Sequence, residues 1–418
     1  MRVSNALLPN GGFATEKLLA PERALVAFFS RANVIRPQIE QVGLDVCVGR
    51  ILAQPVHADA DYPAAPRSTM DGFAILSADA PGSLKIGGEV AMGSVWDRRL
   101  ERGSALKIAT GGLLPAGSDA VVPVEDARVS GEMVVVSTAI PAGDCVNPIG
   151  SDMRSGEQML GPGRRIGAAE VGLLATLGIV KVPVFRIPVF GLLSSGDELV
   201  PPADQPALGQ IRDSNRYAIA AGLRAMGAYA RHFPTVSDEP GALEGMLREA
   251  LETCDGVILT GGSSVGERDR TPGAIASLGS PGVLVHGLRV KPGKPTVFGA
   301  IDGKPILGLP GNPVSALLIL QAVAAPIVDA LTGLRPSEPR IVCAIAAEPI
   351  RGRVGWTWFV PVQLERTGER YSARPLPLRS ANVSLLARAS GFVTMGENEE
   401  LVAAGAALWV HQFSAGGL

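Results

Sequence analysis

Across residues 187–335 the chain repeats one pattern, in which a short apolar run is followed by a glycine-rich loop and then by an amphipathic helical stretch. The apolar runs at 187–193 and 255–260 have the length and composition of strands that are buried on both faces. Strands that are separated by helices pair in parallel, because the crossover returns the chain to the same edge of the sheet. The pattern therefore predicts a doubly wound α/β domain at 187–335.

The segments around this domain have a different character. Residues 57–146 are rich in glycine, valine and short turns and predict a small β-rich domain, and the alternating stretch 336–418 predicts a second one. Helical spacing at 14–32 and at 168–177 flanks the first β-rich segment. We therefore expect a multidomain fold that also contains one discontinuous helical and extended domain. The predicted domain ranges are 1–56 with 147–186, 57–146, 187–335 and 336–418.

Composition excludes several classes of function. The 418 residues carry a formal net charge of -2, and 19% of them are charged, so no global basic field for nucleic acid is present. The four cysteines are too scattered for a zinc knuckle or a redox pair, and the four histidines form no H-E-x-x-H motif. Zinc hydrolysis and disulfide exchange are thereby excluded. Carboxylates, lysines, hydroxyls and backbone N–H groups remain for any chemistry.

Sequence signals for export and for membrane insertion are missing. The N-terminal stretch lacks the apolar core of a signal peptide. The longest apolar run, at 316–328, contains Gln321 and Pro326 and is too short to span a bilayer. We therefore expect a cytoplasmic protein that binds neither membranes nor nucleic acid.

Four loops rich in glycine or proline follow the predicted strands. In open parallel sheets the ligand crevice lies outside the carboxyl ends of the strands, so these loops are expected on one rim. Each combines small residues, which let backbone N–H groups approach a ligand, with charged or polar residues, a combination suited to phosphate or another oxyanion. The loops are SSGDELV at 194–200, TGGSSVGERD at 260–269, KPGKP at 291–295 and GLPGNPVS at 308–315.

The fold alone explains some of the polar residues in these segments and not others. Asn312 precedes Pro313, so helix capping explains it, and capping of a following helix also explains Asp238. Glu198 and Asp269 sit where no cap is needed, and carboxylates that bind magnesium beside substrate phosphates account for them. The lysines of KPGKP are either solvated or act as point-charge donors to a phosphate.

One short pattern favours a different chemistry. Residues 262–266 match G-x-S-x-G after a strand, the nucleophile elbow of a serine hydrolase, with Ser264 as the nucleophile and with Asp302 and His411 downstream in the required order. The H-G-G-G oxyanion segment of such enzymes is missing, which argues against this alternative. The phosphate-loop motif G-x-x-x-x-G-K-[ST] is absent, and no G-x-G-x-x-G motif follows a strand.

Taken together, eight ordered segments resemble the molybdopterin molybdenumtransferase family, the MoeA-type proteins that include the gephyrin E domain. The segments are STMDGFA at 68–74, TGGLLPAGSDAVV at 110–122, IGSDMRSGE at 149–157, SSGDEL at 194–199, DSN at 213–215, GGSSVGERD at 261–269, KPGKP at 291–295 and GLPGNPVSA at 308–316. Any one of them is a weak signal, whereas eight in order are specific. The resemblance covers about residues 50–330.

The resemblance implies four domains per subunit, with linker and dimerisation functions in the discontinuous domain and molybdopterin binding in the α/β domain. It implies a homodimer whose active cleft is formed by the α/β domain of one subunit and the β-rich domain of the other. It also implies a reaction in which molybdate enters the dithiolene of adenylylated molybdopterin and AMP is released, assisted by Mg²⁺. Further implied partners are a molybdopterin adenylyltransferase and proteins that mature molybdoenzymes.

The resemblance carries over site residues position by position. The expected catalytic residues are Asp71, Asp152, Glu198, Asp238, Asp269, Lys291 and Lys294. The expected cofactor-binding residues are Ser68, Thr69, Ser194, Gly196, Asp197, Gly262, Ser264, Pro310, Gly311, Asn312 and Ser315. Glu198 and Asp269 are the candidate metal ligands. Because molybdate is an oxyanion that needs hydrogen-bond donors, the candidates for its site are Arg67, Ser68 and Thr69.

The sequence departs from the family pattern in three places. SSGDEL replaces the usual S-T-G-D-E-L, TGGSSVG replaces S-G-G-V-S-V-G, and Arg212 precedes DSN where an aromatic residue is common. The acidic and lysine positions are intact. The departures leave open whether molybdate or tungstate is the metal substrate. They also permit an alternative function, that of a non-catalytic carrier which stores or delivers molybdopterin.

Overall fold

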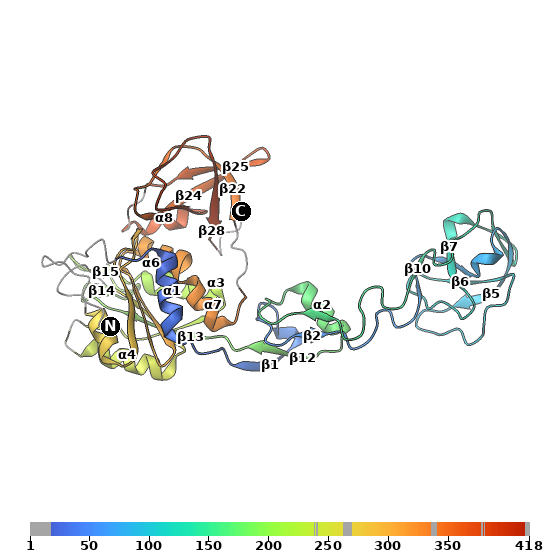
Figure 1. Ribbon diagram of the computed structural model, residues 1–418, viewed down its shortest axis with the longest axis horizontal. Helices are drawn as coiled ribbons and strands as arrows, with labels where there is room; N and C mark the ends of the chain where they lie inside the picture. The colour runs from blue at the N-terminus through green and yellow to red at the C-terminus, as the bar shows by residue number, and fades with distance from the viewer. Residues whose placement is uncertain are drawn as a thin grey trace. The chain divides into compact units, whose positions relative to one another are not determined.

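The structure is a computed structural model, and it describes residues 18–237, 239, 241–261, 270–335, 341–377, 379 and 381–413. The chain divides into two compact units. The first comprises Met1–Ala53, Gly163–Val171 and Lys181–Leu418, and the second comprises Gln54–Pro162 and Gly172–Val180. A multidomain α/β fold with β-rich domains is thereby confirmed (Figure 1). The four predicted domain ranges stay a prediction.

A six-stranded sheet forms the centre of the first unit. Its strands are β13 (Val189–Ser194), β16 (Tyr229–His232), β17 (Gly256–Thr260), β18 (Pro281–His286), β20 (Val297–Ile301) and β21 (Lys304–Leu309), in the spatial order β16-β13-β17-β21-β20-β18. The first four strands in this order pair in parallel, as predicted, whereas β20 is antiparallel to both of its neighbours. Asp302 and Gly303 turn the chain from β20 into β21 with φ of 48° and 78°. An Asp-Gly pair between apolar runs is a strong hairpin signal, so this strand was predictable and was missed.

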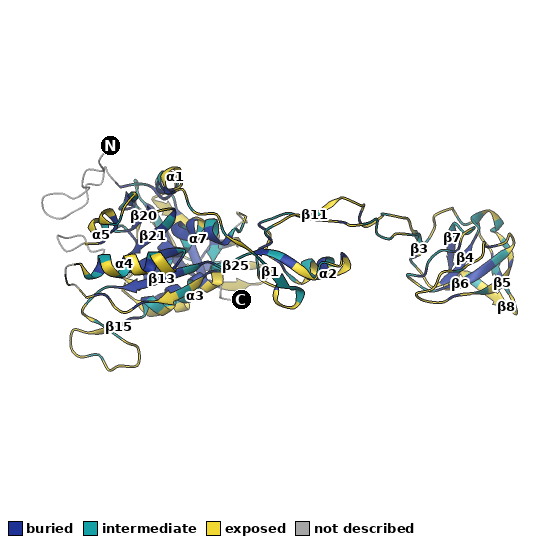
Figure 2. Ribbon diagram, turned by 90° about the horizontal axis from the view of Figure 1, so that it is seen from below, coloured by how far each residue is buried: buried dark blue, intermediate teal, exposed yellow. Residues whose placement is uncertain are grey.

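Helices cover both faces of this sheet (Figure 1). They are α1 (Pro21–Ala32), α3 (Asn215–Met226), α4 (Ala242–Thr253), α5 (Thr271–Ser277), α6 (Pro313–Ile319) and α7 (Ala325–Thr332). Successive residues of β13 point to opposite faces. Leu192 therefore packs in the apolar cluster under α1, α3, α6 and α7, and Leu193 packs in the cluster under α4 and α5. Figure 2 shows the buried strands between helices that expose their outer faces.

Local sequence explains both ends of α3. Asp213 precedes the helix, and its Oδ1 accepts a hydrogen bond from the backbone N–H of Arg216 over 3.1 Å. Gly227 ends the helix in the left-handed conformation with φ of 90°, and its N–H donates to the carbonyl oxygen of Arg224. The polar residues at 213–215 and the glycine at 227 therefore account for where the helix begins and ends.

Two other helix starts differ from the prediction, and a third agrees with it in position. Helix α1 begins at Pro21 rather than at residue 14, because proline lacks an N–H group and suits the first turn; residues 14–17 lie outside the described residues. Asp238 also lies outside them, and Gly241 holds the N-cap position of α4. Asn312 does occupy the N-cap position of α6, but its side chain makes no capping hydrogen bond. The predicted N-cap position of Asn312 is therefore confirmed, without a capping hydrogen bond from its side chain.

Helices α6 and α7 belong to one helical stretch of 20 residues, Pro313–Thr332, whose middle part, Leu320–Ala324, is π-helical. Among the described residues it is the one helix long and apolar enough to cross a membrane by length and composition. In the structure it lies in the protein core, where Val314, Leu318 and Val323 are fully buried. Its first residue, Pro313, agrees with the helix start that the Asn312-Pro313 pair indicates in the sequence.

A small β-barrel follows the α/β domain within the first unit. Its strands are β22 (Ile341–Ala346), β24 (Thr357–Thr367), β25 (Arg370–Pro375), β26 (Gly391–Met395) and β28 (Ala407–Gln412). They pair in the order β24-β25-β22-β28-β26, and β26 returns to β24 and closes the ring. Strand β19 (Val290–Lys291) adds to the edge of β24. Phe359 and Phe392 of the barrel lie in the apolar cluster that also holds α6, so the barrel and the α/β domain share a core.

The remaining elements of the first unit are short. An antiparallel pair joins β1 (Ile39–Gly43) to β12 (Lys181–Phe185), and a parallel pair joins β14 (Leu199–Val200) to β15 (Ile211–Arg212). A third pair joins β23 (Ile350–Arg351) to β27 (Leu401–Val402), and α8 (Val383–Arg388) precedes β26. A single 3-10 turn occupies Leu44–Val46.

The second unit contains a six-stranded sheet with the order β7-β4-β6-β5-β9-β8. The strands are β4 (Gly72–Ile75), β5 (Gly82–Val90), β6 (Ser104–Ile108), β7 (Ala120–Pro123), β8 (Ala127–Ser130) and β9 (Met133–Val136), with 3-10 turns at Ser77–Asp79 and Val124–Asp126. Two short antiparallel pairs join β3 (Arg67–Ser68) to β10 (Val146–Asn147) and β2 (Val56–His57) to β11 (Gln158–Leu160). Helix α2 (Ala168–Thr176) has residues in the ranges of both units.

Candidate functional site

The described residues that directly follow β13, β17 and β21 meet at the carboxyl edge of the central sheet. The backbone N–H of Ser195 donates to the carbonyl oxygen of Thr260 over 2.9 Å. A Cβ atom on Gly261 would lie 2.1 Å from the carbonyl oxygen of Ser195, and Gly261 has φ of +83°, so glycine is required there. Asn215 donates from Nδ2 to the carbonyl oxygen of Gly311 over 2.6 Å. Segments that are far apart in the sequence are thereby held at one place.

The SSGDEL segment leaves β13 at this edge. Ser194 is buried, and its Oγ accepts a hydrogen bond of 3.4 Å from the Thr260 hydroxyl. Gly196 has φ of +145°, and a Cβ atom there would lie 2.6 Å from Oε2 of Glu198. The Glu198 carboxylate therefore folds back over the backbone of its own loop. Asp197 and Glu198 are both exposed, so the loop presents acidic oxygen atoms to solvent.

A cavity of about 410 Å³ lies beside the first turn of α6. Five of the expected site residues line it, namely Lys291, Lys294, Pro310, Asn312 and Ser315. It is also lined by three residues that the sequence-based prediction did not include, Arg353, Trp356 and Trp358. Three cationic side chains around one cavity suit an anionic ligand. We call this space the cationic cavity.

Strand pairing brings the barrel to the cationic cavity. Strands β19 and β24 run parallel, with Lys291 opposite Trp358. The backbone N–H of Thr357 donates to the carbonyl oxygen of Arg289 over 3.1 Å. The Arg289 guanidinium forms a bidentate ion pair with the Glu397 carboxylate, with hydrogen bonds of 2.9 and 3.2 Å. Two of the four tryptophans of the chain fall within the segment 356–358. That clustering was the one local signal in the sequence for the side of the cavity that the barrel forms.

The KPGKP turn is fixed against α6. Gly293 has φ of +115°, and a Cβ atom there would lie 2.3 Å from Cδ1 of Ile319, so no larger residue fits. The hydroxyl of Thr296 donates to the carbonyl oxygen of Gly293 over 2.6 Å, and the backbone N–H of Leu288 donates to that of Lys294 over 2.9 Å. The backbone that carries both lysines is therefore held on two sides.

In the second unit, Thr110 holds the Asp71 carboxylate. Oδ1 of Asp71 accepts hydrogen bonds from the backbone N–H of Thr110 over 2.7 Å and from its hydroxyl over 2.9 Å. These bonds, the backbone one foremost, hold the pKa of Asp71 below its ordinary value. Asp71 is exposed, so it presents an ionised carboxylate to solvent at neutral pH. The contact also joins the STMDGFA segment to the segment that begins at Thr110.

Ser68 and Thr69 lie just before this carboxylate. Ser68 is buried, and its hydroxyl donates to the carbonyl oxygen of Met70 over 2.5 Å and accepts from the N–H of Met70 over 3.2 Å. The backbone N–H of Thr69 donates to the carbonyl oxygen of Cys145 over 2.9 Å. The Ser68 hydroxyl thus closes a local turn. Cofactor binding by these two residues stays a prediction.

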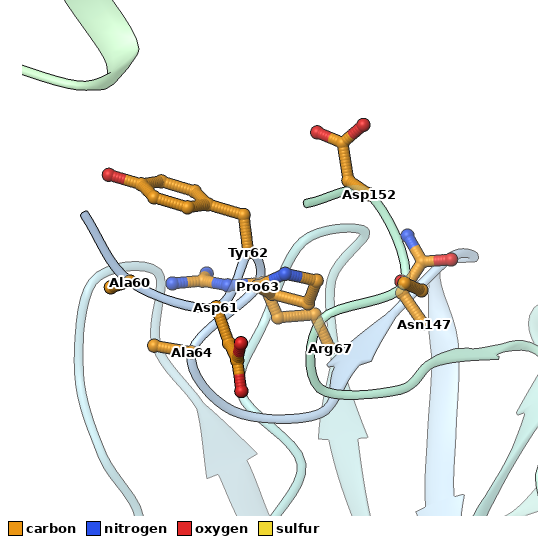
Figure 3. A pocket seen from close by; sticks show the side chains of 9 residues that line it. Ala60, Asp61, Tyr62, Pro63, Ala64, Arg67, Asn147 and Asp152 are labelled. Atoms are coloured by element: carbon orange, nitrogen blue, oxygen red, sulfur yellow. The ribbon is translucent and has the colours of Figure 1, made fainter. Parts of the chain in front are cut away.

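A second cavity, of about 730 Å³, lies in the same unit between the segments 60–67 and 147–152 (Figure 3). Asp152 and Arg67 line it, together with Asp61, Tyr62 and Asn147. In Figure 3, Asp152 and Asn147 belong to one segment and the other labelled side chains belong to the facing one. The structure thus brings an expected acidic residue and a candidate molybdate donor to one cavity.

The expected site residues fall into two groups, one in each unit. Ser68, Thr69, Asp71 and Asp152 lie in the second unit, and Ser194, Gly196, Asp197, Glu198, Lys291, Lys294, Pro310, Gly311, Asn312 and Ser315 lie in the first. Asp238, Gly262, Ser264 and Asp269 lie outside the described residues. Within the part of the chain that the structure describes, no group of three or more His, Cys, Asp or Glu side chains could hold a metal ion.

The serine hydrolase alternative gains no support from the described residues. Strand β17 ends beside Leu309, the last residue of β21, whereas Asp302 precedes the first residue of β21 and turns the β20–β21 hairpin. His411 stacks on Phe392 in the barrel, with ring centroids 5.1 Å apart. Asp302 therefore lies at the opposite end of the sheet from the end of β17, after which the G-x-S-x-G segment follows in the sequence.

Models of known protein families match most of the chain. The MoeA N-terminal region (domain I and II) matches residues 19–178, and the MoeA C-terminal region (domain IV) matches residues 344–413. Between them, a probable molybdopterin binding domain matches residues 191–330.

Whole-chain relatives agree with these matches. A molybdopterin molybdenumtransferase of Nostoc sp. is 34% identical over 340 residues, which cover 77% of this chain and 78% of the relative. A molybdopterin molybdenumtransferase of Haemophilus influenzae is 31% identical over 322 residues, which cover 76% of this chain and 79% of the relative. The crystal structure of a molybdopterin biosynthesis MoeA protein from Pyrococcus horikoshii, 31% identical, matches with a TM-score of 0.79 over 95% of this chain and 99% of that one. The chain therefore belongs to the molybdopterin molybdenumtransferase family of enzymes.

Proposed function

We propose that this protein inserts molybdate into the dithiolene of adenylylated molybdopterin and releases AMP, as a step of molybdenum cofactor biosynthesis. The observation that carries the proposal is the cationic cavity beside the start of α6, which Lys291, Lys294 and Arg353 line. A cavity of this charge suits a substrate that carries phosphate groups. The relatives named molybdopterin molybdenumtransferase and the probable molybdopterin binding domain at 191–330 support the same substrate class.

The proposed reaction breaks the phosphoanhydride bond between the molybdopterin phosphate and AMP. An oxygen atom of water or of molybdate forms the new bond to phosphorus, and the displaced phosphate oxygen leaves with the electron pair. Negative charge grows on the phosphate oxygens, and positioned cations stabilise it. Lys291, Lys294 and Arg353 line the cationic cavity and would supply these cations. The sulfur ligands of the metal belong to the pterin, so four scattered cysteines suffice in the protein.

Magnesium is the divalent ion that we propose for this step, with Glu198 and Asp269 as its protein ligands. The exposed Glu198 carboxylate, folded over Gly196, offers the hard oxygen donors that magnesium prefers. Magnesium keeps several waters and takes further ligands from substrate phosphates, so it needs few carboxylates. When bound, the ion would neutralise charge on the phosphate oxygens.

We also propose that the active form is a homodimer in which each site combines residues of both subunits. Asp71 and Asp152 lie in the second unit, and the lysines of the cationic cavity lie in the first. Carboxylates repel an anionic substrate unless cations or a metal ion compensate them. A site that unites the two groups meets this requirement, and its activity should fall when the dimer dissociates on dilution.

The proposal is tested by AMP release from adenylylated molybdopterin in the presence of molybdate and Mg²⁺. Lys291→Met and Lys294→Met should each lower kcat about 100-fold or more, the usual cost of removing one donor to a developing oxyanion. Lys85→Met is the matched control, because Lys85 is exposed on β5 and lines neither cavity. Binding of molybdopterin without AMP release by the wild-type protein would overturn the enzymatic proposal and support the carrier alternative.

A further inference from the structure

One contact in the cationic cavity joins an expected catalytic lysine to the barrel. Nζ of Lys291 lies 4.5 Å from the centroid of the Trp358 ring. The two residues are register partners in the parallel pairing of β19 with β24, and both line the cavity. A cation this close to the face of an aromatic ring is attracted by the ring quadrupole. The ammonium group is therefore held at the wall of the cavity by a residue from the C-terminal part of the chain.

Burial of the indole N–H of Trp358 destabilises the folded protein, and packing in the fold alone does not explain why an indole is present. Its Nε1 is buried and has no hydrogen-bond partner within the described ranges of the chain. A buried donor without a partner destabilises the folded state. Phenylalanine would supply an aromatic wall without that donor. Tryptophan, however, offers a cation the most favourable ring face, so the contact with Lys291 gives a physical reason for an indole at this position.

Restraint of Lys291 has a direct effect on anion binding. A free lysine side chain samples many rotamers and loses this freedom when its ammonium group binds a ligand. The backbone of β19 is already fixed by its pairing with β24, and the Trp358 ring restricts the ammonium group as well. The Lys291 side chain has therefore already lost part of its conformational entropy in the folded protein, so binding of the anion requires a smaller further loss.

We propose that Trp358 is a positioning residue that holds the Lys291 ammonium group in place to bind a tetrahedral oxyanion, so that the α/β domain and the barrel form this anion site jointly. The identification of that oxyanion as part of the pterin substrate or as molybdate rests on the proposed function. The negative charge of the ligand follows from the three cationic side chains around the cavity.

A double-mutant cycle tests the proposal. Binding of inorganic phosphate and of molybdate to the full-length protein is measured by calorimetry for Trp358→Leu, Lys291→Met and the double variant. Trp358→Leu should weaken binding of at least one anion about three- to tenfold, because the cation–π contact and the restraint of the lysine are both lost. The same change should have no effect in the Lys291→Met background, because Trp358 acts through the lysine. Trp409→Leu, which removes a 63% exposed tryptophan on β28, is the matched control and should bind like the wild type.

Trp358→Phe separates positioning from a merely structural role. This variant keeps an aromatic wall, removes the unpartnered donor and weakens the attraction for Lys291. It should keep a Tm close to that of the wild type while its affinity falls between those of the wild type and Trp358→Leu. A Tm loss without an affinity change would show a structural residue and overturn the proposal.

Two further results would also overturn it. One is a Trp358→Leu effect of equal size with and without Lys291. The other is the absence of any Lys291-dependent binding of either anion by the wild-type protein. The binding assay requires no turnover. A protein that binds anions through the Lys291–Trp358 pair but releases no AMP would therefore contradict the proposed function and leave this inference standing.

Discussion

Asn215 donates a hydrogen bond from Nδ2 to the carbonyl oxygen of Gly311 over 2.6 Å, and this bond ties the first residue of α3 to the loop that follows β21. Pro310 and Asn312, on either side of Gly311, line the cationic cavity. The bond therefore connects the DSN and GLPGNPVSA segments. It gives a positioning role to a residue that carried no assigned role in the sequence-based site.

Removal of the Asn215–Gly311 hydrogen bond should destabilise the loop that lines the cationic cavity. Asn215→Ala leaves the carbonyl oxygen of Gly311 without its partner, and a loss of about 1–3 kcal/mol in the free energy of unfolding is expected. The displaced loop should lower kcat/KM for AMP release about tenfold or more. Asn382→Ala is the control, because Asn382 is exposed and makes no capping hydrogen bond at α8. Wild-type kcat/KM in Asn215→Ala would contradict the positioning role.

Thr110 should control the ionisation of Asp71. Thr110→Val removes the hydroxyl donor at 2.9 Å and keeps the backbone donor at 2.7 Å. With fewer hydrogen bonds to the carboxylate, the pKa of Asp71 rises toward its ordinary value. If Asp71 acts as a carboxylate, the acidic limb of the kcat/KM profile against pH should move to higher pH. The profile is measured for both proteins, and coincident acidic limbs would remove Asp71 from the reaction.

Asp329 should make stability depend on pH. Burial raises the pKa of Asp329 to about 6, and the nearby Arg165 opposes this shift. The folded state therefore holds the proton more tightly than the unfolded state, in which the pKa has its ordinary value of 3.8. The free energy of unfolding consequently falls as pH rises from 3.8 to about 6. Above about pH 6 the carboxylate is charged in both states, and the folded protein keeps the full destabilisation from burying that charge.

Asp329→Asn tests this linkage. The substitution removes the ionisable group, so the variant should be more stable than the wild type at neutral pH by on the order of 1–2 kcal/mol, after allowance for solvent screening. Near pH 3.5 the wild-type carboxyl is protonated in the folded state, and the two proteins should unfold at about the same temperature. Calorimetric Tm values at both pH values provide the measurement. A gain that does not change with pH would exclude titration of Asp329 as its cause.

Two glycine-to-alanine substitutions should have opposite effects. Gly261→Ala places a Cβ atom 2.1 Å from the carbonyl oxygen of Ser195 at a φ of +83°, so it should destabilise the protein by about 1–3 kcal/mol and impair AMP release. Gly245 lies within α4 with no atom within 4 Å of the added methyl group. Gly245→Ala should therefore stabilise by about 0.5–1 kcal/mol, because alanine loses less entropy in a helix. The Tm values of the two variants distinguish these effects. Equal changes in Tm would contradict the close approach of Gly261 to the carbonyl oxygen of Ser195.

Local patterns were sufficient to predict much of the α/β domain. Strands β13 and β17 are apolar runs buried on both faces, and Gly227 ends α3 with the left-handed conformation that glycine adopts readily. Strand β20 was missed although its signal is local, since Asp302 and Gly303 form a two-residue hairpin turn. The sequence-based prediction proposed no strand at 297–301.

The candidate site was predictable only in part. The motifs placed Lys291, Lys294 and the loop at 310–312 together, and the structure has them around one cavity. The wall formed by Arg353 and Trp358 depends on the pairing of β19 with β24, which joins segments that are distant in the sequence. No local pattern specifies such a partner, because edge pairing is decided by the packing of the whole barrel on the α/β domain.

The central claim, that this chain is the molybdate-inserting enzyme, is tested most directly by one measurement. Purified protein is incubated with adenylylated molybdopterin and Mg²⁺, with and without molybdate, and AMP is quantified together with the molybdenum that enters the pterin. The proposed reaction predicts that molybdate is required and that AMP and molybdenum-loaded pterin appear in equal amounts. Metal insertion without AMP release, or stable binding of the adenylylated pterin with neither product, would contradict it.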